Sequence, residues 1–268
     1  MPTSSKFKII REATPVVDDD DVPDTLFLSQ NDKTGLSVNA SIARTCRPTP
    51  ACGVYCYGLD GRIAMPAALK RQAENAALFS VDEGDWAKLA DEAMDVAHVV
   101  SRQQDFLRMF GVGDLQPGSV YFINQLSSYA KLAKPKFRIW VSTRKFDLAE
   151  NLVDNPNLHV MLSFDASTPE KWRTMGLRLL AQRRPQFFAA WVRQEVGERV
   201  PRWVDVVFEL HRHGHGRAKR EPHARACPAT IHATMPGSVE LEGACGKCRF
   251  CFDAGRREGT PLINIRRR

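Results

Sequence analysis

Strand-like and helix-like segments alternate along most of the chain, and this alternation constrains the fold more than any other sequence feature. Apolar runs predict strands at 35–42, 120–124, 137–143, 158–164 and 203–210. Apolar residues at helical spacing predict helices over 65–79, 82–108, 126–133, 146–154, 168–183 and 186–198. Because strands that alternate with helices favour βαβ units, the sequence predicts an α/β fold with mainly parallel strands.

The strand–helix units are short, and we predict a TIM-like or partial (β/α) barrel, with an open doubly wound sheet as the second choice. Residues 1–34 are rich in Asp, Pro, Ser and Thr and predict an irregular N-terminal arm. Residues 35–268 then form a single barrel-like domain, which includes a C-terminal cysteine-rich wrap over 223–255. Residues 211–226 interrupt the alternating pattern with basic and polar side chains.

The number and distribution of cysteines indicate metal binding. Seven cysteines, an odd number, fit poorly with a fully paired disulfide framework. The sequence contains no apolar run long enough to cross a membrane, and its acidic N-terminus does not resemble a secretory signal. We therefore expect a cytoplasmic protein with no membrane partner. Disulfides are rare in that compartment, where clustered cysteines are more often metal ligands or catalytic groups.

The first cysteine set is Cys46, Cys52 and Cys56, which follows the predicted strand 35–42. Three thiolates within eleven residues can hold one face of a [4Fe–4S] cluster. One iron of such a cluster lacks a protein thiolate and is open to a small-molecule ligand. The sequence therefore predicts an open, reactive cluster at this loop.

The second set is Cys227, Cys245, Cys248 and Cys251. A Cys-x2-Cys-x2-Cys run with one remote cysteine before a proline is typical of ferredoxin-like ligation. Four thiolates close every iron, so a second [4Fe–4S] cluster here would serve electron transfer or structure. Electron transfer implies a donor protein such as a ferredoxin or flavodoxin. Structural zinc, with His223 or His232 as substitute ligands, is the alternative.

Polar residues at the predicted strand ends are further site candidates. Active sites of barrels lie at the carboxyl ends of the strands, which here gives Asn124, Arg144 and Asp165 as catalytic candidates. With Arg44 and Arg47 they would form a cationic rim beside the first cluster. An arginine there could hold an anionic substrate bidentately. Alternatively, Arg144 pairs with Asp165 only to neutralise a buried charge.

The basic character of the chain leaves a nucleic-acid partner open. The formal net charge is +7, but two clusters bound by seven thiolates would lower it to about +4. The basic segment 211–225 could contact phosphates, although no aromatic interleaving or known nucleic-acid motif supports this. A non-catalytic redox sensor or nucleic-acid-associated regulator is therefore the alternative to an enzyme.

Several ordered motifs resemble the bacteriophage "gene product 88"-type family, which occurs on phages and plasmids. They include TCRPTPAC…CYG, VSTRKFD, NLHVMLSFDAS, ACPAT and CGKCRFCF, and they cover about residues 37–252. A helix with Arg71 and Asn75 also matches, and these two residues could support the cluster loop through hydrogen bonds. The resemblance implies an iron–sulfur protein and does not imply a particular reaction.

A more distant likeness is to radical S-adenosylmethionine enzymes, in which a three-cysteine cluster follows the first strand of an α/β barrel. Tyr55 directly precedes Cys56, as an aromatic residue often precedes the third cysteine in those enzymes. This likeness implies S-adenosylmethionine as a further cofactor. The departures argue against it, because those enzymes use Cys-x3-Cys-x2-Cys and a Gly-Gly-Glu-type segment that this chain lacks.

Overall fold

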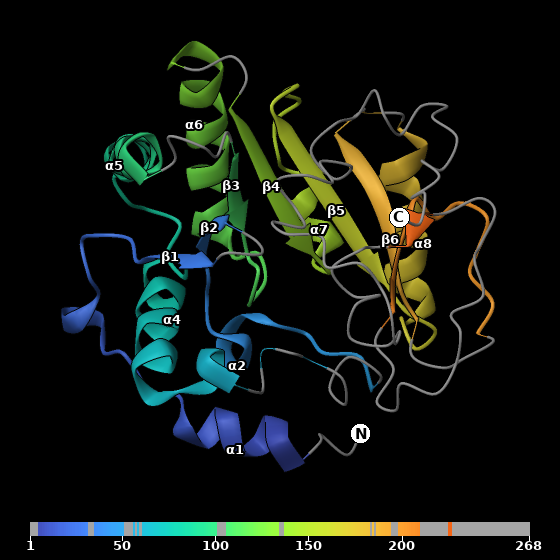
Figure 1. Cartoon of the computed structure of the whole chain (residues 1–268), viewed down its shortest axis with the longest axis horizontal. Coiled ribbons are helices and arrows are strands. Elements are labelled where there is room, and N and C mark those ends of the chain that lie inside the picture. The colour runs from blue at the N-terminus through green and yellow to red at the C-terminus, as the bar shows by residue number, and fades with distance from the viewer. Residues whose placement is uncertain are drawn as a thin grey trace, which may run out of the picture.

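The computed structural model describes residues 5–31, 35–50, 56, 58, 61–100, 106–133, 137–182, 184, 186–193, 198–209 and 225–226. It contains an eight-stranded sheet flanked by helices (Figure 1). The strands are β1 (Leu28–Asn31), β2 (Gly35–Val38), β3 (Phe106–Met109), β4 (Arg138–Thr143), β5 (Leu158–Phe164), β6 (Phe187–Arg193), β7 (Val206–Glu209) and β8 (Arg225–Ala226). The helices are α1 (Ser5–Ala13), α2 (Ile42–Thr45), α4 (Pro66–Leu78), α5 (Trp86–Val100), α6 (Pro117–Ala133), α7 (Phe146–Ala149) and α8 (Glu170–Ala181), with 3-10 turns η1 (Asp19–Asp21) and η3 (Gly61–Ala64).

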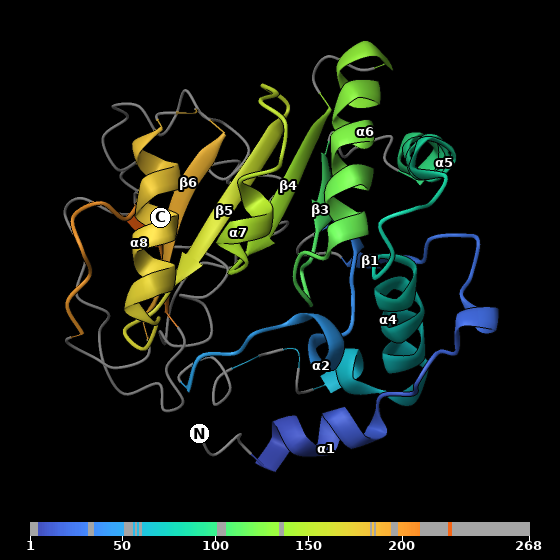
Figure 2. The same cartoon turned by 180° about the vertical axis from the view of Figure 1, so that it is seen from behind.

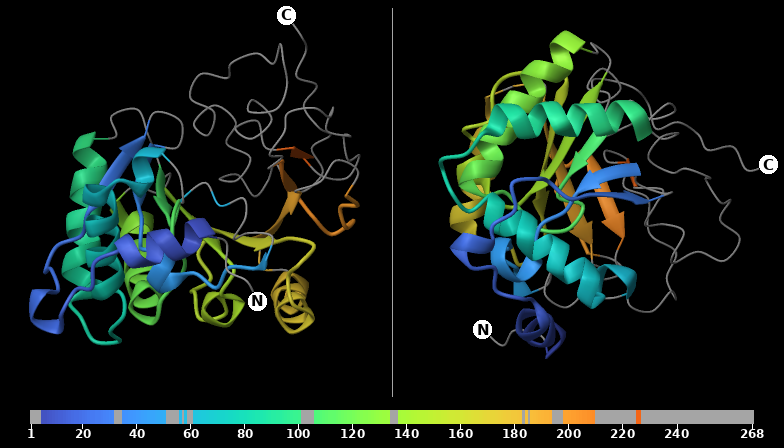
Figure 3. Two further views of the ribbon diagram at one scale, coloured as in Figure 1. Left: turned by 90° about the horizontal axis from the view of Figure 1, so that it is seen from below. Right: turned by 90° about the vertical axis from the view of Figure 1, so that its left-hand side faces the viewer.

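The strands lie in the sheet in the same order as in the chain. β1 is antiparallel to β2, and every later pair from β2 to β8 is parallel. Because right-handed crossovers in one direction place all connections on one face, the helices gather there. Figure 2 shows α6, α7 and α8 in front of the strands, and the left view of Figure 3 shows the same layer from its edge.

The predicted α/β fold with mainly parallel strands is confirmed. The strand order never reverses, whereas a doubly wound sheet, our second choice, requires a reversal. Within the described residues no pairing joins β1 to β8, so the sheet is open and a closed TIM-like barrel is not observed. None of the described helices is long and apolar enough to cross a membrane.

The sheet is covered on both faces. The main core lies between the helices and one face, and it includes Val141, Leu162 and Phe164. A second apolar cluster, with Trp140, Met161 and Phe188 among its members, covers the opposite face. β5 is consequently buried along its whole length, which explains its continuous apolar sequence.

One predicted strand is wrong, because residues 120–124 lie inside α6. The helix begins at Pro117, whose ring suits a first helical position. Its buried residues recur every three or four positions, at Val120, Ile123, Ser127 and Ala130. The strand that lies between β2 and β4 in the sheet is β3. We predicted a helix over 82–108, which overlaps β3, but α5 ends at Val100.

The predicted helix over 186–198 is also wrong, because its first half is the strand β6. Phe187 and Trp191 pack in the main core, whereas Phe188 packs in the cluster on the opposite face. A strand that is buried on both faces shows no alternation, and its aromatic residues favour strand structure.

The N-terminal segment, which we predicted to be irregular, contains α1, η1 and β1. Asn75 of α4 ties this segment to the sheet. Its amide accepts the Phe27 N–H at 2.9 Å and donates to the carbonyl oxygens of Phe27 at 2.9 Å and Asn39 at 2.7 Å. Arg71 stacks over the Phe27 ring at 5.5 Å. These observed contacts go to residues 27 and 39, whereas we expected them to go to the cysteine loop.

Candidate functional site

The carboxyl ends of the parallel strands meet at one edge of the sheet, and the predicted site residues follow them. Cys46 follows β2 and the short helix α2, Arg144 directly follows β4, and Asp165 directly follows β5. Asp114 follows β3 at the same edge. The correct placement of β4 and β5 from the sequence thus brings Arg144 and Asp165 to the predicted edge.

A cavity of about 150 Å³ opens at this edge. Its wall combines sulfur, charged and hydroxyl groups from the ends of β4 and β5 and from the segments that follow β2, β3 and β4, namely Cys46, Cys56, Asp114, Arg144, Ser142 and Ser163. Gly58 and Gly111 also line it. The cavity is therefore small, lined largely by apolar atoms and bordered by two thiols.

The two described thiols lie against an apolar wall. Cys46 and Cys56 are partly buried and pack on a cluster that contains Ile42, Leu69 and Val112. Gly58 allows this close packing, because a Cβ there would lie 3.1 Å from Val112 Cγ1 and 3.6 Å from Cys56 Sγ. Thiols that have an apolar shell on one side and an open cavity on the other suit an iron–sulfur cluster.

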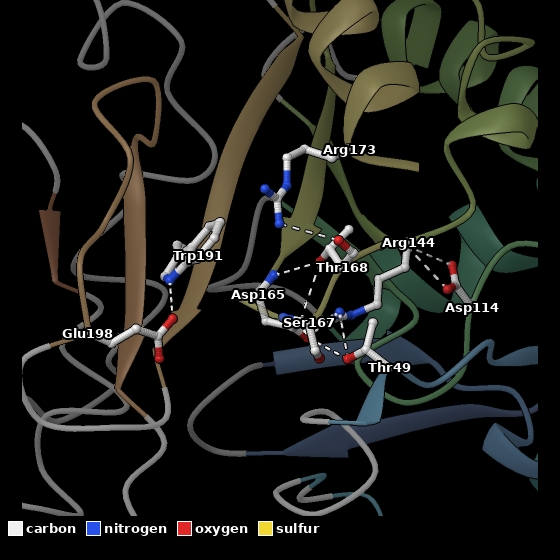
Figure 4. A network of polar contacts seen from close by, with 9 residues as sticks. All are labelled: Thr49, Asp114, Arg144, Asp165, Ser167, Thr168, Arg173, Trp191 and Glu198. Atoms are coloured by element: carbon white, nitrogen blue, oxygen red, sulfur yellow. Dashed lines mark hydrogen bonds and ion pairs between the residues drawn. The ribbon is translucent and has the colours of Figure 1, made fainter. Parts of the chain in front are cut away.

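A buried ion pair stands beside the thiols. Arg144 Nη1 lies 2.6 Å from Asp165 Oδ2, and Asp165 is fully buried (Figure 4). The Thr49 hydroxyl donates to the same Oδ2 at 2.6 Å, and the N–H and hydroxyl of Ser167 donate to Oδ1, each at 2.8 Å. Thr49 lies between Cys46 and Cys52 in the chain, so this network fixes the cysteine loop to the ends of β4 and β5.

The electrostatics of the pair favour an ionised carboxylate. Burial alone raises the pKa of Asp165, but the Arg144 charge and the hydrogen bonds from Thr49 and Ser167 outweigh it and hold the pKa below the ordinary value. The arrangement matches the alternative that we left open, in which Arg144 neutralises a buried charge.

Asp114 joins three segments at the cavity. Its Oδ1 accepts the Thr143 hydroxyl at 2.5 Å and the Leu115 N–H at 2.8 Å, and its Oδ2 accepts the Arg144 N–H at 3.2 Å. Its own N–H donates to Thr45 Oγ1 at 2.8 Å. Burial outweighs these bonds and raises the pKa of Asp114.

Lys145 borders the same region and is half-buried. Burial lowers the pKa of Lys145, against the opposing attraction of Asp114. Arg47 also acts to lower it, whereas the Cys46 and Asp147 charges act to raise it. Lys145 therefore interacts electrostatically with Cys46, which lines the cavity.

The family model described as gene product 88 matches residues 16–254. The chain belongs to the gene product 88 family. The matched span includes all seven cysteines and every residue that lines the cavity. No curated protein and no solved structure matches the chain.

Five of the seven predicted ligands of this gene product 88 protein lie outside the described residues, namely Cys52, Cys227, Cys245, Cys248 and Cys251. So does most of the basic segment 211–225, of which only Arg225 is described. Within the described part, no three His, Cys, Asp or Glu residues form a group that could hold a metal. The two described members of the first set do share one cavity wall.

Asn124, a predicted catalytic residue, is not in the site of this family member. It lies within α6, where its side chain donates to the Asn151 carbonyl at 3.1 Å and accepts the Val153 N–H at 2.9 Å. The error follows from the wrong strand at 120–124. The two rim arginines differ: Arg44 is exposed and does not line the cavity, whereas Arg47 lines it and pairs with Asp147 at 3.5 Å.

Sequence reasoning missed Asp114 and Thr49. Asp114 ends the segment FLRMFGVGD, a short apolar run followed by two glycines and a carboxylate. That pattern is typical of a strand and its loop, and it could have located Asp114. Thr49 had no comparable signal, because its role depends on a contact with a residue 116 positions away.

Proposed function

We propose that this gene product 88 protein is an iron–sulfur protein that binds a small molecule beside a three-thiolate [4Fe–4S] cluster. The observation that carries the proposal is the shared cavity, on which Cys46 and Cys56 converge beside Arg144 and Asp114. An iron without a cysteine thiolate supplies a position at which a small molecule can bind and be activated.

Different residues would bind the cluster, exclude water from it and position its loop. Cys46, Cys52 and Cys56 would hold the cluster, and Ile42, Val112 and Leu69 would exclude water from its inner side. The network of Thr49, Arg144 and Asp165 would hold the loop in place. Its charges are already paired, so its role is to position the ligands.

The four C-terminal cysteines would hold a second, closed cluster for electron transfer or structure. Cys227 directly follows β8 in the sequence, as the first set follows β2. Electron transfer would need a donor such as a ferredoxin or flavodoxin.

A more specific version of the proposal is a radical S-adenosylmethionine-like reaction at the first cluster. The sequential, mostly parallel sheet supports the proposed partial (β/α) barrel, and the first set follows the first parallel strand. Both features support the likeness, whereas the cysteine spacing departs from it. Incubation of the reduced protein with S-adenosylmethionine tests this form, and absence of any cleavage product counts against it.

Metal analysis after anaerobic purification tests the main proposal. We expect about eight irons and eight acid-labile sulfides per chain, since each cluster contains four of each. Cys46→Ala and Cys248→Ala should each remove about half of the iron. Ser128→Ala, an exposed hydroxyl on α6, is the control and should keep all of it. A colourless protein that contains zinc and no sulfide would be a structural zinc protein instead.

A further inference from the structure

We infer that Arg108 forms an anion-binding site beside the cavity, next to Gly111, where it holds a carboxylate or phosphate group of the small molecule. This inference rests on the proposed function for the identity of the bound molecule, because the anion would be part of the ligand that faces the thiols. The guanidinium itself can be tested whether or not a cluster is present.

Arg108 is placed on the sheet face opposite the helices. It lies in β3, and its neighbours Leu107 and Met109 both pack in the main core on the helix side. Because side chains alternate along a strand, Arg108 points to the other face. In the sheet it pairs with Ser37 of β2 and Trp140 of β4.

Among the described residues, the Arg108 guanidinium has no partner of opposite charge. It makes no hydrogen bond or ion pair with any residue in the part of the chain that the structure describes, and its Nε is buried. Arg173 and Arg184 also bury Nε, but their terminal nitrogens bind Glu170 and the Leu152 carbonyl. A permanently charged group that is partly buried without such a bond is costly, which indicates a place for a ligand.

The stacking of Arg108 fixes its orientation. Its Cζ lies 4.2 Å from the centre of the Trp140 ring. Stacking leaves the edges of the planar guanidinium available, and these edges carry the fork of N–H donors that matches a carboxylate or phosphate. Arg144 cannot take this role, because Asp165 and Thr49 already bind its Nη1.

The guanidinium borders the cavity that contains the thiols. A Cβ on Gly111, which lines the cavity, would lie 3.9 Å from both Cζ and Nε of Arg108. Ser142, two residues after Trp140 on the same strand face, lines it as well. An anion at Arg108 would therefore belong to a molecule that extends toward Cys46 and Cys56.

Calorimetric titration of the anaerobically purified protein at low salt tests the inference, with inorganic phosphate and succinate as separate probes. Tighter binding of one probe identifies the class of anion. Arg108→Gln should weaken binding by about tenfold or more, since it removes charge-assisted hydrogen bonds. Arg71→Gln is the matched control, because Arg71 also stacks on an aromatic ring but does not line the cavity, and it should change nothing.

Arg108→Lys is the second variant, which keeps the charge and removes the fork, and it should bind between wild type and Arg108→Gln. Wild-type protein that binds neither probe, or Arg108 variants that bind both probes as wild type does, would overturn the inference. Iron is measured in the same samples. Anion binding without iron would support the anion site and contradict the cluster proposal. Iron without anion binding would support the cluster proposal and contradict the anion site.

Discussion

The hydroxyl of Thr49 donates to Oδ2 of Asp165 at 2.6 Å, although 116 positions separate the two residues. Thr49 belongs to the loop of the first cysteine set, and Asp165 follows β5. The contact gives the cysteine loop a fixed point on the sheet, and its strength can be measured.

Replacement of Thr49 by Val removes this hydroxyl and keeps the shape of the side chain. We expect a loss of about 1 kcal/mol in the free energy of unfolding, the usual contribution of one hydrogen bond. For the cluster-bound form that we propose, we also expect faster iron loss to a chelator, because the loop would be held less firmly. Urea unfolding and the rate of iron loss measure the two effects. Thr49→Ser keeps the hydroxyl and should restore both values; equal behaviour of the Val and Ser variants would contradict the assigned role.

Replacement of Asp165 by Asn leaves Arg144 without its counter-charge. The side chain of Arg144 is only 12% exposed, so we expect a loss of about 3 kcal/mol at pH 7. Asp147→Asn is the matched control, since Asp147 pairs with Arg47 on the surface, and it should cost less than about 1 kcal/mol. Urea unfolding compares the two, and similar losses would argue against the importance of the buried pair.

The cost of Asp165→Asn should depend on pH in a defined direction. The folded protein holds the pKa of Asp165 below its ordinary value of 3.8, so the unfolded chain takes up the proton first as the pH falls. The stabilisation is complete above pH 3.8 and is lost as the pH falls through the lower folded pKa. The difference between wild type and variant should therefore shrink in acid; a constant difference would show that ionisation contributes nothing.

Asp114→Asn should show the opposite dependence on pH. Burial raises the pKa of Asp114 above 3.8, so its contribution to stability is complete below that pH and is lost as the pH rises through the folded pKa. Wild type should therefore lose stability relative to Asp114→Asn as the pH rises. The same urea series measures this difference. A wild type that gains stability over the variant with rising pH would mean that the hydrogen bonds from Thr143 and Leu115 outweigh burial.

The sequence predicted those parts of the site that depend on local pattern. Arg144 and Asp165 were found because β4 and β5 are long apolar runs, and polar residues directly after such runs lie at the carboxyl edge. Cys46 and Cys56 were found from spacing alone. These predictions needed no knowledge of contacts between distant residues.

Other parts could not be found from local pattern. β3 has only four residues, and its apolar sequence merged with that of the preceding helix. Because β3 was not predicted, Arg108 and Asp114 were not identified as site candidates. The strand predicted at 120–124 instead led to the wrong placement of Asn124. The sequence could not decide whether Arg144 and Asp165 bind a substrate or pair with each other. The choice depends on the distance between them, which only the fold determines.

The sequential strand order has a consequence for the order of assembly. Each parallel strand can add to the strand formed before it, so most of the sheet needs only short loop closures. The bond between Thr49 and Asp165 is an exception, because it cannot form until β3, β4 and β5 have joined the growing sheet. We expect Thr49 and the neighbouring Cys46 to reach their final positions late in folding, on a sheet that is already built.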